Sequence, residues 1–123
     1  LAILAEKLGA NAVLALDNDE NCIENAAENI EINLCKHIDI QLVNELVLRH
    51  SYDTILANIN KNIILDNIAK LAKALVKQGH ILFSGLLVED EKDILTAARL
   101  HGLRHQKTIE RNGWIAMDFS LEG

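Results

Sequence analysis

The alternation of short apolar runs with amphipathic segments constrains the fold of this chain most strongly. Runs with strand character lie at residues 12–16, 38–43, 52–57 and 80–84, and segments with helical spacing lie at 1–8, 19–34, 64–76 and 89–100. Short apolar runs are typical of strands buried on both faces of a sheet. Strands that alternate with helices predict an α/β fold with a doubly wound, mostly parallel sheet and helices on both faces.

Glycines mark the ends of several of these segments. Gly9 follows the first helical run, and Gly79 follows the apolar face that extends from Ile64 to Val76. Because glycine commonly ends helices, we expect both helices to stop there. The predicted fourth helix, over residues 89–100, turns Ile94, Leu95 and Ala98 inward.

The last segment, residues 104–121, has the pattern of an antiparallel hairpin. Asn112-Gly113 is a strong signal for a tight turn between two strands. After it, Ile115, Met117 and Phe119 alternate with more polar residues, which predicts one buried face. We therefore expect the sheet to close with an antiparallel strand.

Composition limits the classes of partner. The chain has 123 residues, half of them apolar, and a net charge of −6. One partial domain over residues 1–123 fits this length. The negative charge disfavours direct binding to nucleic acid or to an anionic membrane.

Cys22 and Cys35 would lie about 20 Å apart on one helix at ~1.5 Å per residue, too far for a disulfide. Buried, reduced thiols without a visible signal peptide predict a cytoplasmic protein.

Polar clusters follow three of the predicted strands, where ligands bind in open parallel sheets. They are Asp17-Asn18-Asp19, Asn44-Glu45 and Asn58-Ile59-Asn60. Asp17 is placed either to accept hydrogen bonds from ribose hydroxyls or to serve as a turn or cap residue, and Asp19 fits a helix cap better. Asn58 offers one acceptor and two donors, or simply forms a turn. Asn44 and Glu45 are weaker candidates. The five histidines lack ligand spacing, so we predict no metal site.

Several segments, in this order, resemble a known family. They are Val13-Leu-Ala-Leu-Asp-Asn-Asp19, Asn25-Ala-Ala-Glu-Asn29, Tyr52-Asp-Thr-Ile-Leu-Ala-Asn-Ile-Asn60, Ser84-Gly-Leu-Leu87 and Gly113-Trp114. Across essentially its whole length the chain resembles the class I S-adenosylmethionine-dependent methyltransferases. More narrowly, it is similar to the PrmA family, bacterial enzymes that methylate a protein of the large ribosomal subunit.

The resemblance implies a Rossmann-like fold, S-adenosylmethionine as the cofactor and a ribosomal protein as the substrate. With the positions of the strand ends, it makes Asp17, Asn18, Asn44, Glu45 and Asn58 the candidate cofactor-binding residues. Asn58 is also the candidate catalytic residue, since it would lie next to the sulfonium. The family's first strand and glycine-rich loop should precede Leu1. Leu1 itself lies within an apolar run of helical spacing. We therefore expect a fragment that is inactive alone.

The strand tip at Asn58 bears on the substrate. By that resemblance, methyltransferases that act on glutamine or on the amino groups of bases have an Asn-Pro-Pro-aromatic motif at this strand tip. This chain instead has Asn58-Ile59-Asn60 and contains no proline. An aliphatic amine, from a lysine side chain or an N terminus, is the better prediction. A lysine amine has a pKa of about 10.4 and must lose a proton before it attacks. The sequence offers no obvious general base.

Two other classes of protein stay open at this stage. An NAD-binding Rossmann domain also places an acidic residue after its second strand, but the closing hairpin disfavours that class. A non-catalytic interaction domain could retain the same fold.

Overall fold

The computed structural model describes residues 3, 7–9, 13–17, 20–42, 48 and 51–122. The chain divides into two compact units, Leu1–Leu46 and Val47–Gly123, and each is described here by itself. Most of the helix expected over residues 1–8 lies outside the described residues, although Lys7 is helical and Gly9, at φ +112°, follows it.

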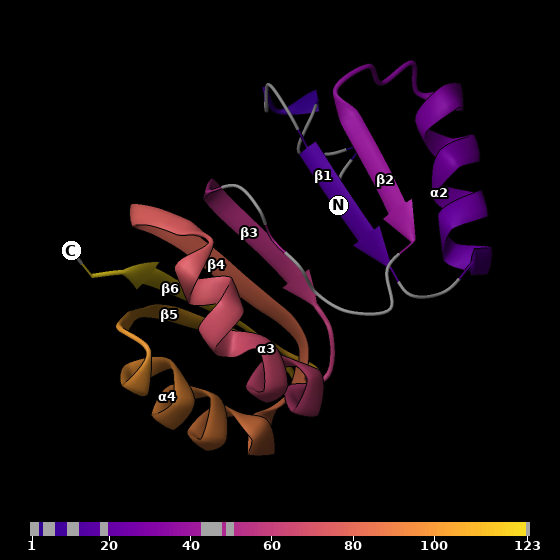
Figure 1. The fold of residues 1–123 in the computed structure, drawn as a ribbon. Coiled ribbons are helices and arrows are strands. Elements are labelled where there is room, and N and C mark those ends of the chain that lie inside the picture. Colours follow the sequence, from indigo (N-terminus) through magenta and orange to yellow (C-terminus); the bar gives the residue numbers. More distant parts are fainter. Residues whose placement is uncertain are drawn as a thin grey trace. The chain divides into compact units, whose positions relative to one another are not determined.

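The first unit is a strand–helix–strand segment (Figure 1). β1 spans Val13–Asp17, α2 spans Glu20–Ile32 and β2 spans Ile38–Leu42. The two strands pair in parallel, from Val13 opposite Ile38 to Asp17 opposite Leu42. This confirms the parallel arrangement predicted for the front of the chain. Among the side chains that the structure describes in this unit, none is fully buried.

The end of α2 differs from the prediction. The apolar pattern extended this helix to Leu34, but the helix ends at Ile32 and Leu34 has a left-handed backbone, with φ 56°. The Leu34 N–H donates to the Glu31 carbonyl at 3.1 Å, and the Cys35 N–H donates to the Ile30 carbonyl at 3.1 Å. This pair of bonds is the Schellman arrangement that closes a helix.

In the second unit, β3 (Tyr52–Asn58), β4 (Leu75–Leu87), β5 (Leu103–Arg111) and β6 (Trp114–Leu121) form one sheet in the order β3-β4-β6-β5. We call it the second-unit sheet. β3 and β4 are parallel, whereas β6 is antiparallel to both of its neighbours. The sheet is therefore mixed, and the antiparallel strand predicted over 114–121 is confirmed.

The hairpin between β5 and β6 turns at the predicted dipeptide. Asn112 and Gly113 both have positive φ, at 54° and 84°. Two consecutive left-handed residues define the type I′ turn, whose twist matches that of paired strands. Asparagine and glycine tolerate this conformation best, so local chemistry alone located the hairpin.

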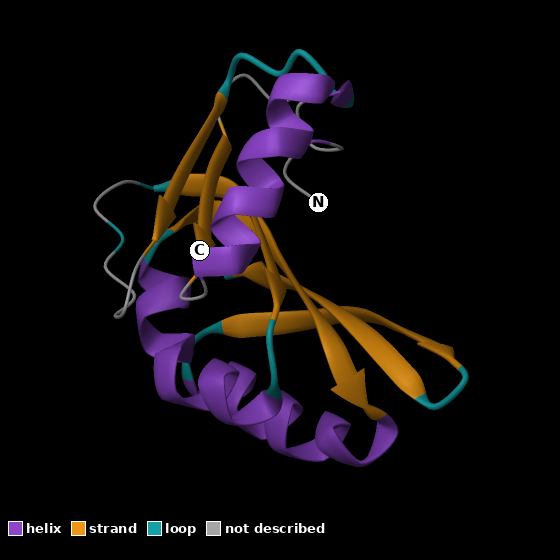
Figure 2. Ribbon diagram, turned by 90° about the vertical axis from the view of Figure 1, so that its right-hand side faces the viewer, coloured by secondary structure: helices purple, strands orange, loops and turns teal. Residues whose placement is uncertain are grey.

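Two helices of this unit lie side by side on one face of the second-unit sheet (Figures 1 and 2). α3 spans Lys61–Lys73, and α4 spans Glu91–Leu100 after a short 3₁₀ turn, η1, at Val88–Asp90. We call the opposite face of the sheet the open face, since no described helix of this unit covers it. The expectation of helices on both faces concerns the whole chain and stays a prediction.

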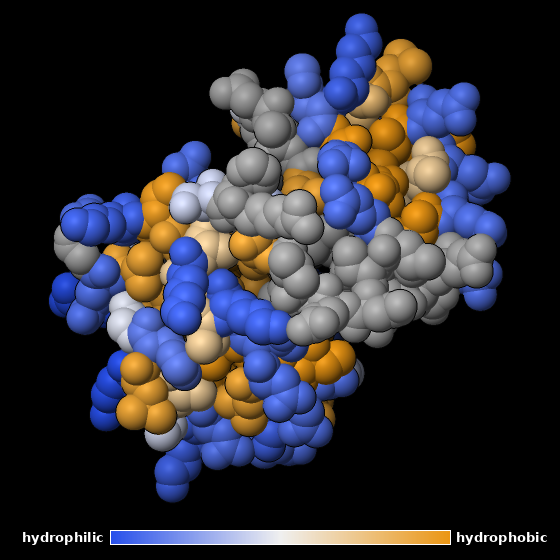
Figure 3. All heavy atoms as spheres, viewed as in Figure 1, coloured by the Kyte–Doolittle hydropathy of each residue, from blue (hydrophilic) through white to orange (hydrophobic). Residues whose placement is uncertain are grey.

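The core of the second unit lies between the sheet and these helices. Its fully buried side chains include Ile64, Ile81, Phe83, Leu86, Ile94, Met117 and Phe119. Phe83 and Phe119 meet edge to face with ring centroids 5.8 Å apart. Among the described residues no polar side chain is buried, and the outer surface over α3 and α4 mixes polar and apolar side chains (Figure 3). The inward faces predicted for α3, α4 and β6 are confirmed at Ile64, Ile94 and Met117.

The end of α3 was predicted wrongly. Leu75 and Val76 fit the helical period, yet the helix ends at Lys73 and both residues belong to β4. Leu75 pairs with Tyr52, whose N–H donates to the Ala74 carbonyl at 2.7 Å. Gly79 therefore does not stop a helix. It lies in an irregular part of β4, where a methyl group would come within 3.0 Å of the Asp53 carbonyl oxygen.

Neither cysteine forms a disulfide, as predicted from their separation. Cys22 lies exposed on α2 and Cys35 is half-buried, so the expectation that both thiols are buried was wrong. No described helix is long and apolar enough to cross a membrane.

Candidate functional site

The candidate site of the second unit is the tip of β3, formed by Asn58, Ile59 and Asn60. Asn58 is the last residue of β3 and pairs in register with Ser84 of the parallel strand β4. Parallel strands end at the same edge of a sheet, so Ser84 and Gly85 lie beside this tip. The Asn58 side chain is exposed, and no hydrogen bond joins it to the described residues.

The two asparagines of the tip have different roles. Asn60 is the N-cap of α3, and its side-chain oxygen accepts a hydrogen bond from the Ile63 N–H at 3.0 Å. This bond satisfies one of the amide groups that a helix start leaves without partners. The Asn58 side chain has no such partner among the described residues, so its amide is available to a ligand.

β4 carries a bulge beside the tip. Against β6, Phe83 pairs with Met117 and Leu86 pairs with Ile115, so β4 has one extra residue over this stretch. Gly85 lies in the bulge with φ +75°. An added Cβ at Gly85 would lie 2.5 Å from the Asn58 Oδ1 atom. The Asn58 amide therefore occupies space that any other residue at position 85 would fill.

An ionic cluster ties the start of α3 to the start of α4. The Lys61 ammonium lies 3.0 Å from Asp93 Oδ2 and 3.8 Å from Asp90 Oδ1. The hydrogen bond and charge of Asp93, followed by the charges of Asp90 and Glu89, raise the pKa of Lys61 above its ordinary value. Asp90 also accepts a hydrogen bond from the Leu87 N–H at 2.9 Å. The start of α3, which follows the β3 tip, and Leu87, which follows Gly85, therefore both contact Asp90.

The predicted cofactor-binding residues of the first unit are only partly described. Asp17 is the last residue of β1, opposite Leu42 at the end of β2. This backbone position is the one expected for a ribose ligand, although its side chain is not described. Asn18, Asn44 and Glu45 lie outside the described residues.

Sequence reasoning missed two residues of the second-unit site. Gly85 entered only as part of a family motif, although a glycine after a strand signals a bulge or a close backbone approach. Lys61 was not among the candidate residues, and its ammonium pairs with Asp93.

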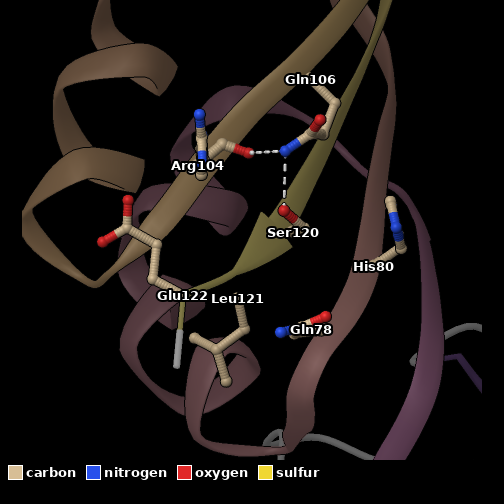
Figure 4. Close-up of a pocket in the computed structure, with 7 residues that line it drawn as sticks. All are labelled: Gln78, His80, Arg104, Gln106, Ser120, Leu121 and Glu122. Atoms are coloured by element: carbon tan, nitrogen blue, oxygen red, sulfur yellow. Dashed lines mark hydrogen bonds between the residues drawn. The ribbon is translucent and has the colours of Figure 1, made fainter.

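A separate hollow lies on the open face, at the other end of β4 from Gly85 (Figure 4). Its volume is about 410 Å³, and it is lined by Gln78, His80, Arg104, Gln106, Ser120, Leu121 and Glu122. The Gln106 amide donates to the Ser120 hydroxyl oxygen at 2.7 Å, and His80 Nδ1 lies 3.0 Å from Asp118 Oδ1. Within the described residues, no three metal-ligating side chains come together. The hollow contains none of the predicted site residues.

The order of elements and the closing antiparallel strand define the class I methyltransferase fold. The solved ribosomal protein L11 methylase from Lactobacillus delbrueckii subsp. bulgaricus superposes with a TM-score of 0.93 at 31% identity, over 99% of this chain and 64% of that one. A methyltransferase from Pyrococcus furiosus, 19% identical, shares the fold with a TM-score of 0.79 over 99% of this chain and 68% of that one.

Sequence comparison narrows the class to one family. The family described as ribosomal protein L11 methyltransferase (PrmA) matches residues 1–122, and the chain belongs to this family. A relative from Porphyromonas gingivalis with the same name is 39% identical over 122 residues, which cover 98% of this chain and 42% of the relative. The chain thus spans less than half the length of that relative. The predicted family and fold are confirmed.

Proposed function

We propose that the full-length protein containing this chain transfers methyl groups from S-adenosylmethionine to amino groups of ribosomal protein L11. Family membership supports the reaction and the substrate protein. The observation that carries the assignment of the methyl-transfer site is the exposed Asn58 amide at the carboxyl end of β3. Among the described residues, no hydrogen bond occupies this amide. The antiparallel strand β6 disfavours an NAD-binding Rossmann domain.

The residues at the strand ends fit this cofactor chemically. A carboxylate that ends a strand suits ribose hydroxyls, and Asp17 ends β1. Asn18, Asn44 and Glu45 are proposed as further cofactor contacts from their sequence positions after strands. When bound, S-adenosylmethionine supplies a methyl group that its sulfonium already activates. The protein then has to align the acceptor, which can contribute about 7–11 kcal/mol in well-oriented reactions.

Asn58 is proposed to orient the acceptor amine. Its side-chain oxygen can accept a hydrogen bond from the amine N–H and so direct the nitrogen lone pair toward the methyl carbon. The amine must first be neutral, and a partly dry site would lower its pKa toward that state. Ile59 and the cap residue Asn60 frame Asn58 without a proline, which favours an aliphatic amine over a planar amide.

Replacing Asn58 with alanine tests this function. In the full-length protein, Asn58→Ala should lower the single-turnover rate at saturating cofactor on the order of a hundredfold, because one positioning contact is lost. Affinity for S-adenosylhomocysteine should change far less. Asn62→Ala, an exposed asparagine on α3, is the matched control and should react normally. An Asn58→Ala enzyme with the control's rate would leave Asn58 as a turn residue.

The isolated 123-residue chain is proposed to be inactive, because it spans less than half the length of the Porphyromonas gingivalis relative. Methylation of the ribosomal protein by the isolated chain would contradict this. We also propose that the full-length protein acts in the cytoplasm, a location that fractionation of cells expressing a tagged protein would test.

A further inference from the structure

The contact between Asn58 and Gly85 joins the candidate catalytic side chain to a backbone bulge. A Cβ at Gly85 would lie 2.5 Å from Asn58 Oδ1, 3.7 Å from Asn58 Cγ and 3.9 Å from the Ile59 nitrogen. Non-bonded carbon and oxygen atoms do not approach to 2.5 Å, since repulsion rises steeply inside van der Waals contact. The amide of Asn58 can hold this orientation only while residue 85 lacks a side chain.

The surroundings leave the backbone little freedom to move away from Asn58. Phe83 and Leu86, on either side of the bulge, are fully buried in the core. After the bulge, the Leu87 N–H donates to Asp90, and Lys61 joins the start of α3 to Asp93. Close-packed interiors resist displacement. A side chain at position 85 would therefore turn the exposed Asn58 amide rather than shift the strand.

The left-handed backbone at Gly85 makes this geometry possible. Between Phe83 and Leu86, β4 accommodates one extra residue against β6, and Gly85 within it has φ +75°. Glycine adopts this conformation readily, because it has no Cβ to clash with its own backbone. The bulge thus brings main chain, rather than a side chain, against the Asn58 amide.

We propose that Gly85 is a positioning residue for methyl transfer, because its missing side chain leaves room for the orientation that the Asn58 amide adopts. This inference rests on the proposed role of Asn58. Gly85 acts through Asn58 and touches no reacting atom. A substituent at position 85 should slow the reaction with little effect on cofactor affinity.

Gly102 provides a matched control for the backbone strain. It also has φ +75°, but an added Cβ there would meet only Leu121 Cδ1, at 4.0 Å. Gly85→Ala and Gly102→Ala therefore carry the same left-handed penalty, and only Gly85→Ala intrudes on Asn58. Both variants, Asn58→Ala and the double variant Gly85→Ala/Asn58→Ala are to be made in the full-length protein.

We expect Gly85→Ala to lower the single-turnover rate about as much as Asn58→Ala does, on the order of a hundredfold. S-adenosylhomocysteine affinity should stay within about threefold of wild type, and Gly102→Ala should turn over normally. The double variant should be no slower than either single variant, since both changes remove one interaction.

The two proposals fail in different ways. If Asn58→Ala reacts at the normal rate, the proposed role of Asn58 is wrong and the positioning inference falls with it. If Asn58→Ala is slow but Gly85→Ala reacts as fast as Gly102→Ala, only the inference about Gly85 is overturned. If Gly85→Ala does not fold, the double variant decides: folding restored by Asn58→Ala supports the contact, and folding not restored overturns it.

Discussion

At the scale of single residues, the β3 tip shows why residue type alone does not identify a site. Asn58 and Asn60 are identical in chemistry and two positions apart. Asn60 has an extended backbone, with φ −72° and ψ 164°, which aims its oxygen at the Ile63 N–H of the helix that follows. Asn58 ends a strand and is left without that task. The sequence predicted the position of the tip. Which asparagine caps the helix and which stays available depends on where α3 begins.

Asp17 can be tested as a cofactor ligand in the full-length protein. Because a hydrogen bond to a charged group contributes about 1.5–3 kcal/mol, Asp17→Ala should weaken S-adenosylhomocysteine binding by that amount in calorimetry. Asp39→Ala is the control, since Asp39 is an exposed acidic residue within β2 and should bind normally. Equal affinities for the two variants would remove Asp17 from the site.

Lys61 gives a pH-dependent prediction. Its pKa is raised above the ordinary value of 10.5, mainly by Asp93. A raised pKa means that the ion pair stabilises the fold fully below that ordinary value and is lost as the pH rises through the higher, folded-state pKa.

Lys61→Met should therefore lower the urea midpoint of the full-length protein at pH 7 to 9, and its difference from wild type should disappear well above pH 10.5. Lys92→Met, at an exposed position of α4, should show no such loss on raising the pH. If the difference in urea midpoint between wild type and Lys61→Met stays constant to well above pH 10.5, the packing of the side-chain methylenes, rather than the charge, would account for it.

At the scale of elements, local chemistry predicted turns better than helix ends. The hairpin lies at Asn112-Gly113 because these residues themselves favour left-handed backbone. The end of α3 was missed because Leu75 and Val76 satisfy the helical period as well as a strand. Pairing of Leu75 with Tyr52 decides between the two, and that contact joins distant parts of the sequence. The Gly85 bulge was missed although a glycine after a predicted strand is a local signal for one.

Leu34 is the clearest mismatch between a residue and its element. Leu34 lies just beyond the last residue of α2, with φ 56°, and it is 78% exposed. A left-handed backbone costs a residue with a Cβ roughly 1–2 kcal/mol, and glycine recovers most of this while gaining freedom in the unfolded chain. Leu34→Gly should therefore stabilise α2 by about 0.5–1 kcal/mol, measured by hydrogen exchange of the last helical amides.

Ile32→Gly is the opposing control for this prediction. Ile32 is also exposed but is the last residue of α2, where glycine costs up to about 1 kcal/mol, the figure for a helix interior. Exchange should therefore become faster in Ile32→Gly and slower in Leu34→Gly. Faster exchange in both variants would mean that the Leu34 side chain stabilises the helix end.

At the scale of the whole molecule, the inward-facing residues were predictable and the division into units was not. Periodicity selected Ile64, Ile94, Met117 and Phe119, all of which are buried. Each strand or helix buries its apolar face wherever its partner lies, so the pattern survives without knowledge of topology. The division depends instead on how contacts are distributed along the chain. The buried core that the structure describes belongs entirely to the second unit, whereas no described side chain of the first unit is fully buried.

This difference predicts how the protein opens. Amides of β4, β6 and α4 should exchange in one slow block, and those of α2 should exchange faster, because stability follows buried apolar contact.

Phe83→Ala removes a fully buried ring that meets Phe119 edge to face. It should lower the exchange free energy of the slow block by about 3–5 kcal/mol. The loss should be equal at every slow amide, since a cooperative unit unfolds as a whole. Leu100→Ala, at the 78% exposed end of α4, should leave the block nearly unchanged. Losses confined to amides beside Phe83 would show that the second unit opens in pieces.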